Sequence, residues 1–175
     1  MIQREVRVAG PEDLPGIARI AVESFRQDYA DRRNTTSTDT AFAQEWIAAR
    51  MRLYPYGVYV VCVDAVSGIV GYNSWVLGGG RSGVVHSDQT AVAAGHRGQG
   101  VGLRLKQGSE HILADHLRRI LDVDLSVLTC TCAASNRAMK GLLTATGYEL
   151  RASLGSIYFG AEELMFCKAL DQRTP

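Results

Sequence analysis

Thr90-Ala-Val-Ala-Ala-Gly-His-Arg-Gly-Gln-Gly-Val-Gly-Leu-Arg-Leu-Lys106 is the stretch that decides the fold of this chain. It begins with an apolar run, turns through a glycine-rich segment and continues as an amphipathic segment. Gly98, Gly100 and Gly102 leave the backbone with few Cβ atoms at the point where a helix begins. Backbone N–H groups without helical partners and the positive end of a helix dipole suit such a segment to phosphate binding. We therefore expect an anion site between a strand and a helix.

The composition is that of an ordinary globular protein. The chain has 175 residues, 46% hydrophobic and 21% charged, with a net charge of +1. This length suits one domain, residues 1–175. A charge so close to neutral argues against a nucleic-acid partner or a polybasic membrane surface. Since no apolar run approaches the ~20 residues of a membrane span and the first residues lack a signal-peptide core, we expect no membrane association and a cytoplasmic location.

The four cysteines do not predict a metal site. Cys130 and Cys132 would share one face of a strand, no pair has the CxxC spacing, and no histidine follows Cys130. Each cysteine lies in a largely apolar run, where the residue is usually a small buried hydrophobe. We therefore expect reduced thiols and no metal.

Residue patterns along the chain predict the element order βααβββαβαββ. The predicted strands are residues 6–8, 58–63, 69–77, 84–93, 125–132, 148–158 and 163–170, and the predicted helices are 11–27, 39–53, 101–119 and a short helix capped at 135–136. Short turns predict antiparallel neighbours, and the strand–helix–strand unit around the third helix predicts a parallel pair. The expected fold class is α/β (α+β), a mixed, mostly antiparallel central sheet with helices on both faces.

Two common phosphate-binding motifs do not fit the glycine-rich segment. A Walker motif needs a lysine where this chain has Val101. A dinucleotide fingerprint needs a last glycine where this chain has Leu103 or Leu105, depending on the starting glycine. The pattern that remains is Arg-x-x-Gly-x-Gly over residues 97–102, which we call the glycine loop.

The glycine loop, with a strand before it and a helix after it, resembles the acetyl-CoA motif of the GCN5-related N-acetyltransferase (GNAT) superfamily, (Arg/Gln)-x-x-Gly-x-(Gly/Ala). The later segment from Asn136 to Gly147 and Tyr148 resembles the family's Asn…Gly-(Phe/Tyr) pattern, although Met139 is larger than the usual small residue. The resemblance covers most of the chain. It implies a GNAT-like fold, acetyl-CoA as co-substrate, and transfer of an acetyl group to a primary amine of a small molecule or peptide.

The resemblance also implies a role for each part of the loop region. The backbone before the loop would bind the pantetheine arm like an extra strand, with one N–H polarising the acetyl carbonyl. Amides of the loop would hold the pyrophosphate, the loop arginine would add a cation, and an asparagine would contact the cofactor from the side of the fifth strand. The cofactor-binding residues expected are Ala91, Val92, Arg97, Gly98, Gln99, Gly100, Val101, Gly102 and Asn136.

Acetyl transfer to an amine calls for a general base. Side chains alternate along the strand before the loop, so His86, Asp88, Thr90 and Val92 share one face. Asp88 lies on the strand where many GNAT members carry an acidic residue, which makes it the first candidate base. His86 is the second candidate, because an imidazole ordinarily titrates near neutral pH.

The general acid is not evident. The family's usual tyrosine position holds Leu143, which leaves Tyr148, Tyr158 or water to protonate the leaving thiolate. A cysteine nucleophile is disfavoured because no activating base is marked in the sequence. Two other functions therefore stay open: a non-catalytic acyl-CoA-binding or sensing protein, and an unrelated phosphate-binding module. A homodimer is also left open.

Overall fold

The computed structural model describes residues 4–33, 40–78, 82–155 and 161–170. The chain divides into two compact units. The first comprises Met1–Ser74 and Gln89–Ser109, and the second comprises Trp75–Asp88 and Glu110–Pro175. Among the described residues, no helix is both long and apolar enough to cross a membrane.

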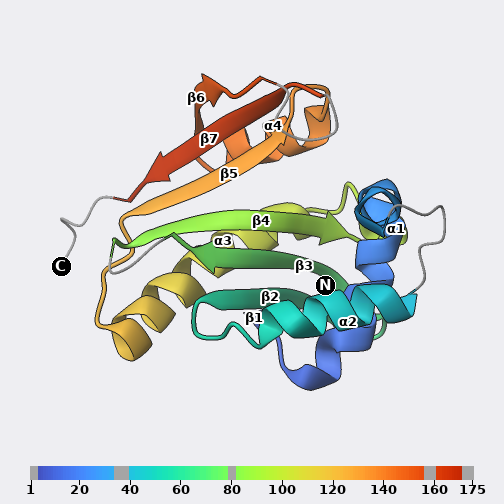
Figure 1. Cartoon of the computed structure of the whole chain (residues 1–175). Coiled ribbons are helices and arrows are strands. Elements are labelled where there is room, and N and C mark those ends of the chain that lie inside the picture. Colours follow the sequence, from blue (N-terminus) through green and yellow to red (C-terminus); the bar gives the residue numbers. More distant parts are fainter. Residues whose placement is uncertain (1–3, 34–39, 79–81, 156–160, 171–175) are drawn as a thin grey trace. The chain divides into compact units, whose positions relative to one another are not determined.

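Seven strands form one sheet in the order β1-β2-β3-β4-β5-β7-β6 (Figure 1). They are β1 (Arg4–Val8), β2 (Gly57–Asp64), β3 (Gly68–Leu77), β4 (Val84–Val92), β5 (Val127–Ala133), β6 (Glu149–Ser153) and β7 (Glu163–Ala169). The β1–β2, β5–β7 and β6–β7 pairs are antiparallel, and the β4–β5 pair is parallel. The mixed, mostly antiparallel sheet predicted from the sequence is confirmed.

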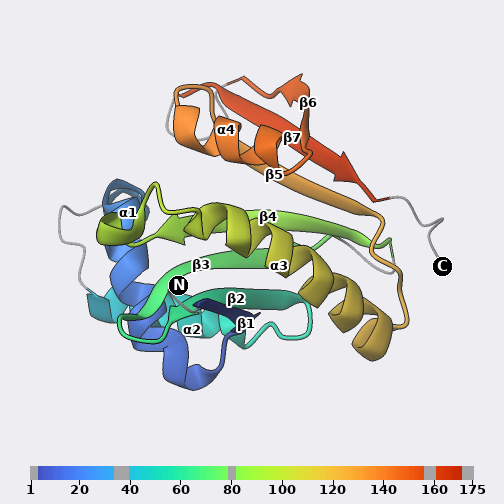
Figure 2. The same cartoon turned by 180° about the vertical axis from the view of Figure 1, so that it is seen from behind.

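Helices cover both faces of the strands in the first unit. The helices α1 (Leu14–Arg33) and α2 (Thr40–Met51) lie in front of the sheet in Figure 1, and α3 (Val101–His116) lies behind it, as Figure 2 shows from the other side. Strand β2 is buried along almost its whole length because it is covered from both sides. The core on the α1 and α2 side includes Ile17, Ile20, Ile47, Tyr59, Val61, Tyr72 and Ala91.

The second unit ends in a strand arrangement that chain order alone does not reveal. Strand β7 lies between β5 and β6, with Val127 opposite Ala169 and Glu149 opposite Cys167. The last strand of the chain is therefore an inner strand, and β6 forms the edge. The short helix α4 (Arg137–Ala145) connects β5 to β6.

Several predicted element ends were wrong. The first helix does not stop near residue 27 but continues to Arg33 beyond a non-helical residue, Phe25, with φ −127° and ψ 30°. Residues 31–33 of the predicted loop 31–38 are thus helical, and the rest lies outside the described residues. The third helix ends at His116 and passes into one wider turn, Leu117–Leu121. Strand β6 is shorter than the predicted 148–158, of which residues 156–158 are not described.

The glycine inside α3 has a packing reason. A Cβ atom added at Gly108 would lie 2.8 Å from Val6 Cγ1 and 3.1 Å from Val6 Cβ. The Val6 Cβ is fixed to the β1 backbone, so the contact cannot be relieved by rotating a side chain. The helix approaches β1 this closely because the residue has no side chain.

We expect Gly108→Ala to destabilise the fold by up to about 2 kcal/mol, because overpacking costs ~1–3 kcal/mol and the gain in helix propensity offsets ~1 kcal/mol of it. Gly141 in α4 is the matched control, since a Cβ atom there meets nothing within 4 Å. Gly141→Ala should stabilise the fold by up to ~1 kcal/mol. Urea unfolding of both variants measures the difference, and a stabilised Gly108→Ala protein would contradict the packing explanation.

Candidate active site

The glycine loop adopts a backbone conformation that requires glycine at two positions. The chain leaves β4, makes a short 3-10 turn over Ala94–His96, and enters α3 at Val101. Gly98 has φ +72° and Gly100 has φ +75°. A Cβ atom on either glycine would meet nothing within 4 Å. The left-handed backbone, not crowding, selects glycine here, and the space beside the loop is open.

The loop also presents the free donors of a helix start. The first backbone hydrogen bond of α3 runs from Arg104 N–H to Gly100 O, at 3.0 Å. The amides of Val101, Gly102 and Leu103 precede this bond and have no acceptor within the helix. Together with the helix dipole, these donors favour an anion in the open space beside the loop. The residues present therefore fit a pyrophosphate group.

Arg97 holds the loop onto the end of β4. Its Nε donates to Val92 O at 3.0 Å, and its Nη2 lies 3.4 Å from Ser24 Oγ and 3.7 Å from the Glu23 carboxylate. The side chain is 55% exposed. Its predicted contact with phosphate stays a prediction, because in this structure the guanidinium is turned toward β4 and α1.

Glu23 was not predicted to support the loop. Its Oε1 accepts a hydrogen bond of 2.7 Å from Ala94 N–H, at the turn before the loop. Glu23 thus joins α1 to the end of β4, and only the tertiary structure reveals this, because the two residues are 71 positions apart.

Arg4 is a second residue that sequence reasoning missed. From β1, its guanidinium reaches the carboxylate of Asp64 and both the main chain and the side chain of Gln99 in the loop. The side chain is only 8% exposed. The sequence signal that could have marked Arg4 is its place on the same strand face as Val6 and Val8, where a charged residue needs a partner.

Strand β4 carries the other predicted site residues. Ala91 is buried, while Val92 is partly exposed on the opposite face. Backbone bonds tie β4 to β3 at both ends, Gly78 N–H to Val84 O and Ala93 N–H to Val70 O, each 2.9 Å. The described pairing of β4 with β5 covers Val84–Ser87 only. The part of β4 that includes Ala91 and Val92 therefore lies beyond that ladder.

The two candidate bases differ in their surroundings. Asp88 is exposed, whereas His86 is half-buried. His86 Nδ1 lies 2.9 Å from the Thr129 hydroxyl on β5, opposite it in the parallel register. This contact engages one imidazole nitrogen of His86, so Asp88 is the more accessible of the two.

Asn136 caps α4, as its position in the sequence indicated. Its Oδ1 accepts a hydrogen bond of 3.0 Å from Met139 N–H. The residue belongs to the second unit. Its predicted contact with the cofactor is not tested by this geometry and stays a prediction.

Among the residues considered as acids or nucleophiles, Tyr148, Cys130 and Cys132 are buried, whereas Tyr158 lies outside the described residues. Leu143 is fully buried in α4, and Tyr148 is 3% exposed. Burial, and to a lesser extent the neighbouring Glu110 carboxylate, raises the pKa of Tyr148 well above its usual value. Burial, with a smaller contribution from Cys130, raises the pKa of Cys132 to about 11. A tyrosine acid and a thiolate nucleophile are both disfavoured by these surroundings.

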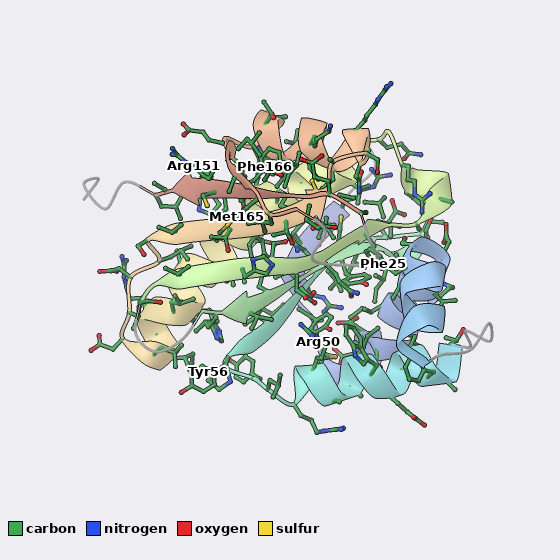
Figure 3. The ribbon with its side chains drawn as sticks, turned by 45° about the horizontal axis from the view of Figure 1, so that its top comes forward. Phe25, Arg50, Tyr56, Arg151, Met165 and Phe166 are labelled. Carbon is green, nitrogen blue, oxygen red and sulfur yellow. The ribbon has the colours of Figure 1, made fainter. Side chains whose placement is uncertain are left out.

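The aromatic residues Trp46, Tyr54, Tyr56 and Trp75 have different surroundings. Trp75 is fully buried, and Trp46 packs beside the core with the Arg50 guanidinium 4.7 Å from its ring centroid. Tyr56 is exposed in the turn after α2 (Figure 3). Tyr54 lines a mainly apolar pocket of about 480 Å³ with Val8, Ala9, Pro11, Leu14, Ala48, Met51 and Arg52.

The chain is similar to several solved acetyltransferase structures. A ribosomal-protein-alanine N-acetyltransferase from Brucella melitensis is 22% identical, with a TM-score of 0.70 over 95% of this chain and 99% of that chain. A GCN5-related N-acetyltransferase from Kribbella flavida is 18% identical, with a TM-score of 0.73 over 95% and 98%. A candidate acetyltransferase from Salmonella typhimurium, solved with its cofactor acetyl-CoA, is 21% identical, with a TM-score of 0.68 over 98% and 96%. No curated protein sequence matches the chain.

A model of the acetyltransferase (GNAT) family matches residues 16–148, which include β2 to β5, the glycine loop, α3 and α4. The family uses acetyl-CoA, and the open, left-handed glycine loop has the geometry that a pyrophosphate needs. The match covers most of the chain, and with the shared fold it shows that this protein belongs to the GNAT acetyltransferase family.

Proposed function

We propose that the chain, acting as one acyltransferase domain over residues 1–175, transfers the acetyl group of acetyl-CoA to a primary amine. The acceptor is a small molecule or a peptide. The observation that carries the proposal is the glycine loop, where Gly98 and Gly100 place open backbone beside the start of α3. The free thiols of all four cysteines support a cytoplasmic location.

The donor is proposed to bind along two backbone segments. Amides of Gly98–Gly102 hold the pyrophosphate, with Arg97 as a nearby cation and Asn136 as a further contact. The main chain of Ala91 and Val92 binds the pantetheine arm as an added strand would. This proposal is supported by the described β4–β5 pairing, which ends at Ser87 and leaves the last residues of β4 outside the ladder.

Acetyl-CoA supplies an activated thioester, and transfer proceeds by direct attack in a ternary complex. The amine nitrogen bonds to the carbonyl carbon, the carbon–sulfur bond breaks, the nitrogen loses a proton, and the thiolate leaves with the electron pair. We assign the proton acceptor to Asp88, directly or through one water, with His86 as the second candidate. Water protonates the thiolate, since Leu143 has no proton to donate and Tyr148 is buried with a raised pKa.

A covalent acetyl-cysteine intermediate is disfavoured. At neutral pH a thiol with a pKa of about 11, as at Cys132, is almost entirely protonated. Cys130 is equally buried, and Cys62 has its pKa raised by burial. The buried thiols thus favour direct transfer over a two-step mechanism.

Gly100→Glu should abolish measurable CoA binding while the protein stays folded, because it places a carboxylate where the phosphates bind and strains a left-handed residue. Gly100→Ala and Gly95→Ala form a matched pair, since a Cβ atom at either position meets nothing within 4 Å but only Gly100 has positive φ. Isothermal titration with CoA should show weaker binding for Gly100→Ala alone. Unchanged affinity in Gly100→Glu would refute the loop assignment.

Acetyl-CoA and CoA should raise the melting temperature more than ATP does, and an amine panel should then reveal the acceptor. The panel contains small primary amines and peptides that begin with alanine, the residue named for the Brucella relative. A true acceptor raises the release of free thiol from acetyl-CoA above background. If CoA binds and no amine raises thiol release, the non-catalytic acyl-CoA-sensing alternative is supported. A thermal shift with ATP and none with acetyl-CoA or CoA would exclude both the acetyltransferase and the acyl-CoA sensor.

With the best acceptor from the panel, Asp88→Asn should lower kcat at pH 7 by roughly 10²-fold or more, the usual contribution of a general base. The loss of kcat should shrink as pH rises, because the acceptor amine then loses its proton to solvent and depends less on a general base. His86→Gln is the comparison and should lower kcat less. A pH-independent loss in Asp88→Asn would indicate that the carboxylate only orients the amine.

A further inference from the structure

Arg4 connects the first strand to the glycine loop through a forked set of hydrogen bonds. Its Nη1 donates to Gln99 O at 3.2 Å, and its Nη2 donates to Gln99 Oε1 at 2.7 Å. The same Nη2 lies 3.4 Å from His96 Nδ1. One nearly buried guanidinium thus contacts the loop's main chain, its central side chain and the turn before it. A planar fork of five donors can do this, whereas a lysine ammonium cannot span the same acceptors.

The guanidinium is held in place from the opposite side by Asp64. Arg4 Nε lies 3.3 Å from Asp64 Oδ2, while Asp64 Oδ1 accepts from the N–H groups of Val66 and Ser67 at 3.0 and 3.1 Å. The backbone bonds from Ser67 and Val66, and then the Arg4 guanidinium, hold the pKa of Asp64 below its usual value. Asp64 is therefore charged at neutral pH, and it links the β2–β3 turn to Arg4.

The Gln99 side chain completes the arrangement. While its Oε1 accepts from Arg4, its Nε2 donates to Gly95 O at 2.9 Å. This bond joins the loop to the turn that precedes it, Ala94–His96. Arg4 thus determines which end of the Gln99 amide faces β1 and which end faces the loop.

Because Arg4 fixes the direction of the Gln99 carbonyl, it also fixes the direction of the Gly100 N–H group in the same peptide. The peptide bond between Gln99 and Gly100 is planar and trans, so the Gly100 N–H points away from the Gln99 C=O. Arg4 holds that carbonyl toward β1, which directs the Gly100 N–H away from β1. Without this restraint, the Gln99–Gly100 peptide can rotate more easily, because the φ of Gly100 can be positive or negative at similar cost.

We propose that Arg4 is a positioning residue for acetyl-CoA: through the Gln99 peptide, it presets the Gly100 amide toward the pyrophosphate. The inference rests on the proposed function of the loop. Because Asp64 neutralises much of its charge, Arg4 acts by orientation and not by attracting phosphate. Pre-organised donors bind an anion more tightly because less conformational entropy is lost on binding.

The test compares Arg4→Ala, Arg4→Lys and the control Arg7→Ala. Arg7 lies on the same strand, but its guanidinium pairs with Asp13, at 2.6 and 2.9 Å. Amide NMR titrations of each protein give Kd for CoA and for pantetheine, which lacks the pyrophosphate, and follow the Gly100 amide directly. Arg4→Ala should weaken CoA binding roughly 10-fold, the value of one charge-assisted hydrogen bond, while pantetheine affinity stays within about 2-fold.

Arg4→Lys should retain most of the loss of CoA affinity. The CoA-induced shift of the Gly100 amide should be smaller in both Arg4 variants than in the wild type. Arg7→Ala should leave the CoA affinity within about 2-fold. Equal losses for CoA and pantetheine, an equal loss in Arg7→Ala, or full rescue by lysine would each overturn the proposal. If the wild-type protein does not prefer CoA to pantetheine, the loop assignment itself fails, and that outcome is separate from any effect of Arg4.

Discussion

The turn from β4 into α3 depends on two residues with positive φ. Gly98 and Gly100 let the chain turn between Val92, the end of β4, and Val101, the start of α3, and begin the helix with its first amides open. Any side chain would fit in the space, yet the backbone angles exclude most residues other than glycine. This constraint puts several N–H groups and a helix dipole at one point, and the rest of the donor site is arranged around it.

The loop is flexible by composition, and its surroundings restrain it. Arg97 connects it to the end of β4, Glu23 holds the preceding turn from α1, and Arg4 holds the central peptide from β1. The contacts from α1 and β1 join residues 71 and 95 positions apart, whereas Arg97 bonds to a residue only five positions back. A loop rich in glycine loses much entropy on ordering. Contacts made before the ligand arrives reduce that cost at the moment of binding.

Fewer residues are assigned to the acceptor side of the proposed site than to the donor side. Asp88 is exposed on β4, while Leu143, Tyr148, Cys130 and Cys132 are buried. A chemistry that needs one base and a polarised thioester remains compatible with this arrangement. If water protonates the thiolate, breakdown of the tetrahedral intermediate needs no general acid from the protein.

The sequence alone determined the element order, the parallel β4–β5 pair, the glycine loop and the cap at Asn136, because each depends on local periodicity or on neighbouring residues. It misplaced the end of α1, which continues past the non-helical residue Phe25 to Arg33. The tertiary structure alone decided that β7 enters between β5 and β6, and that Arg4 and Glu23 reach the loop. These contacts join residues 71 and 95 positions apart, and such pairings leave no periodic trace in one sequence.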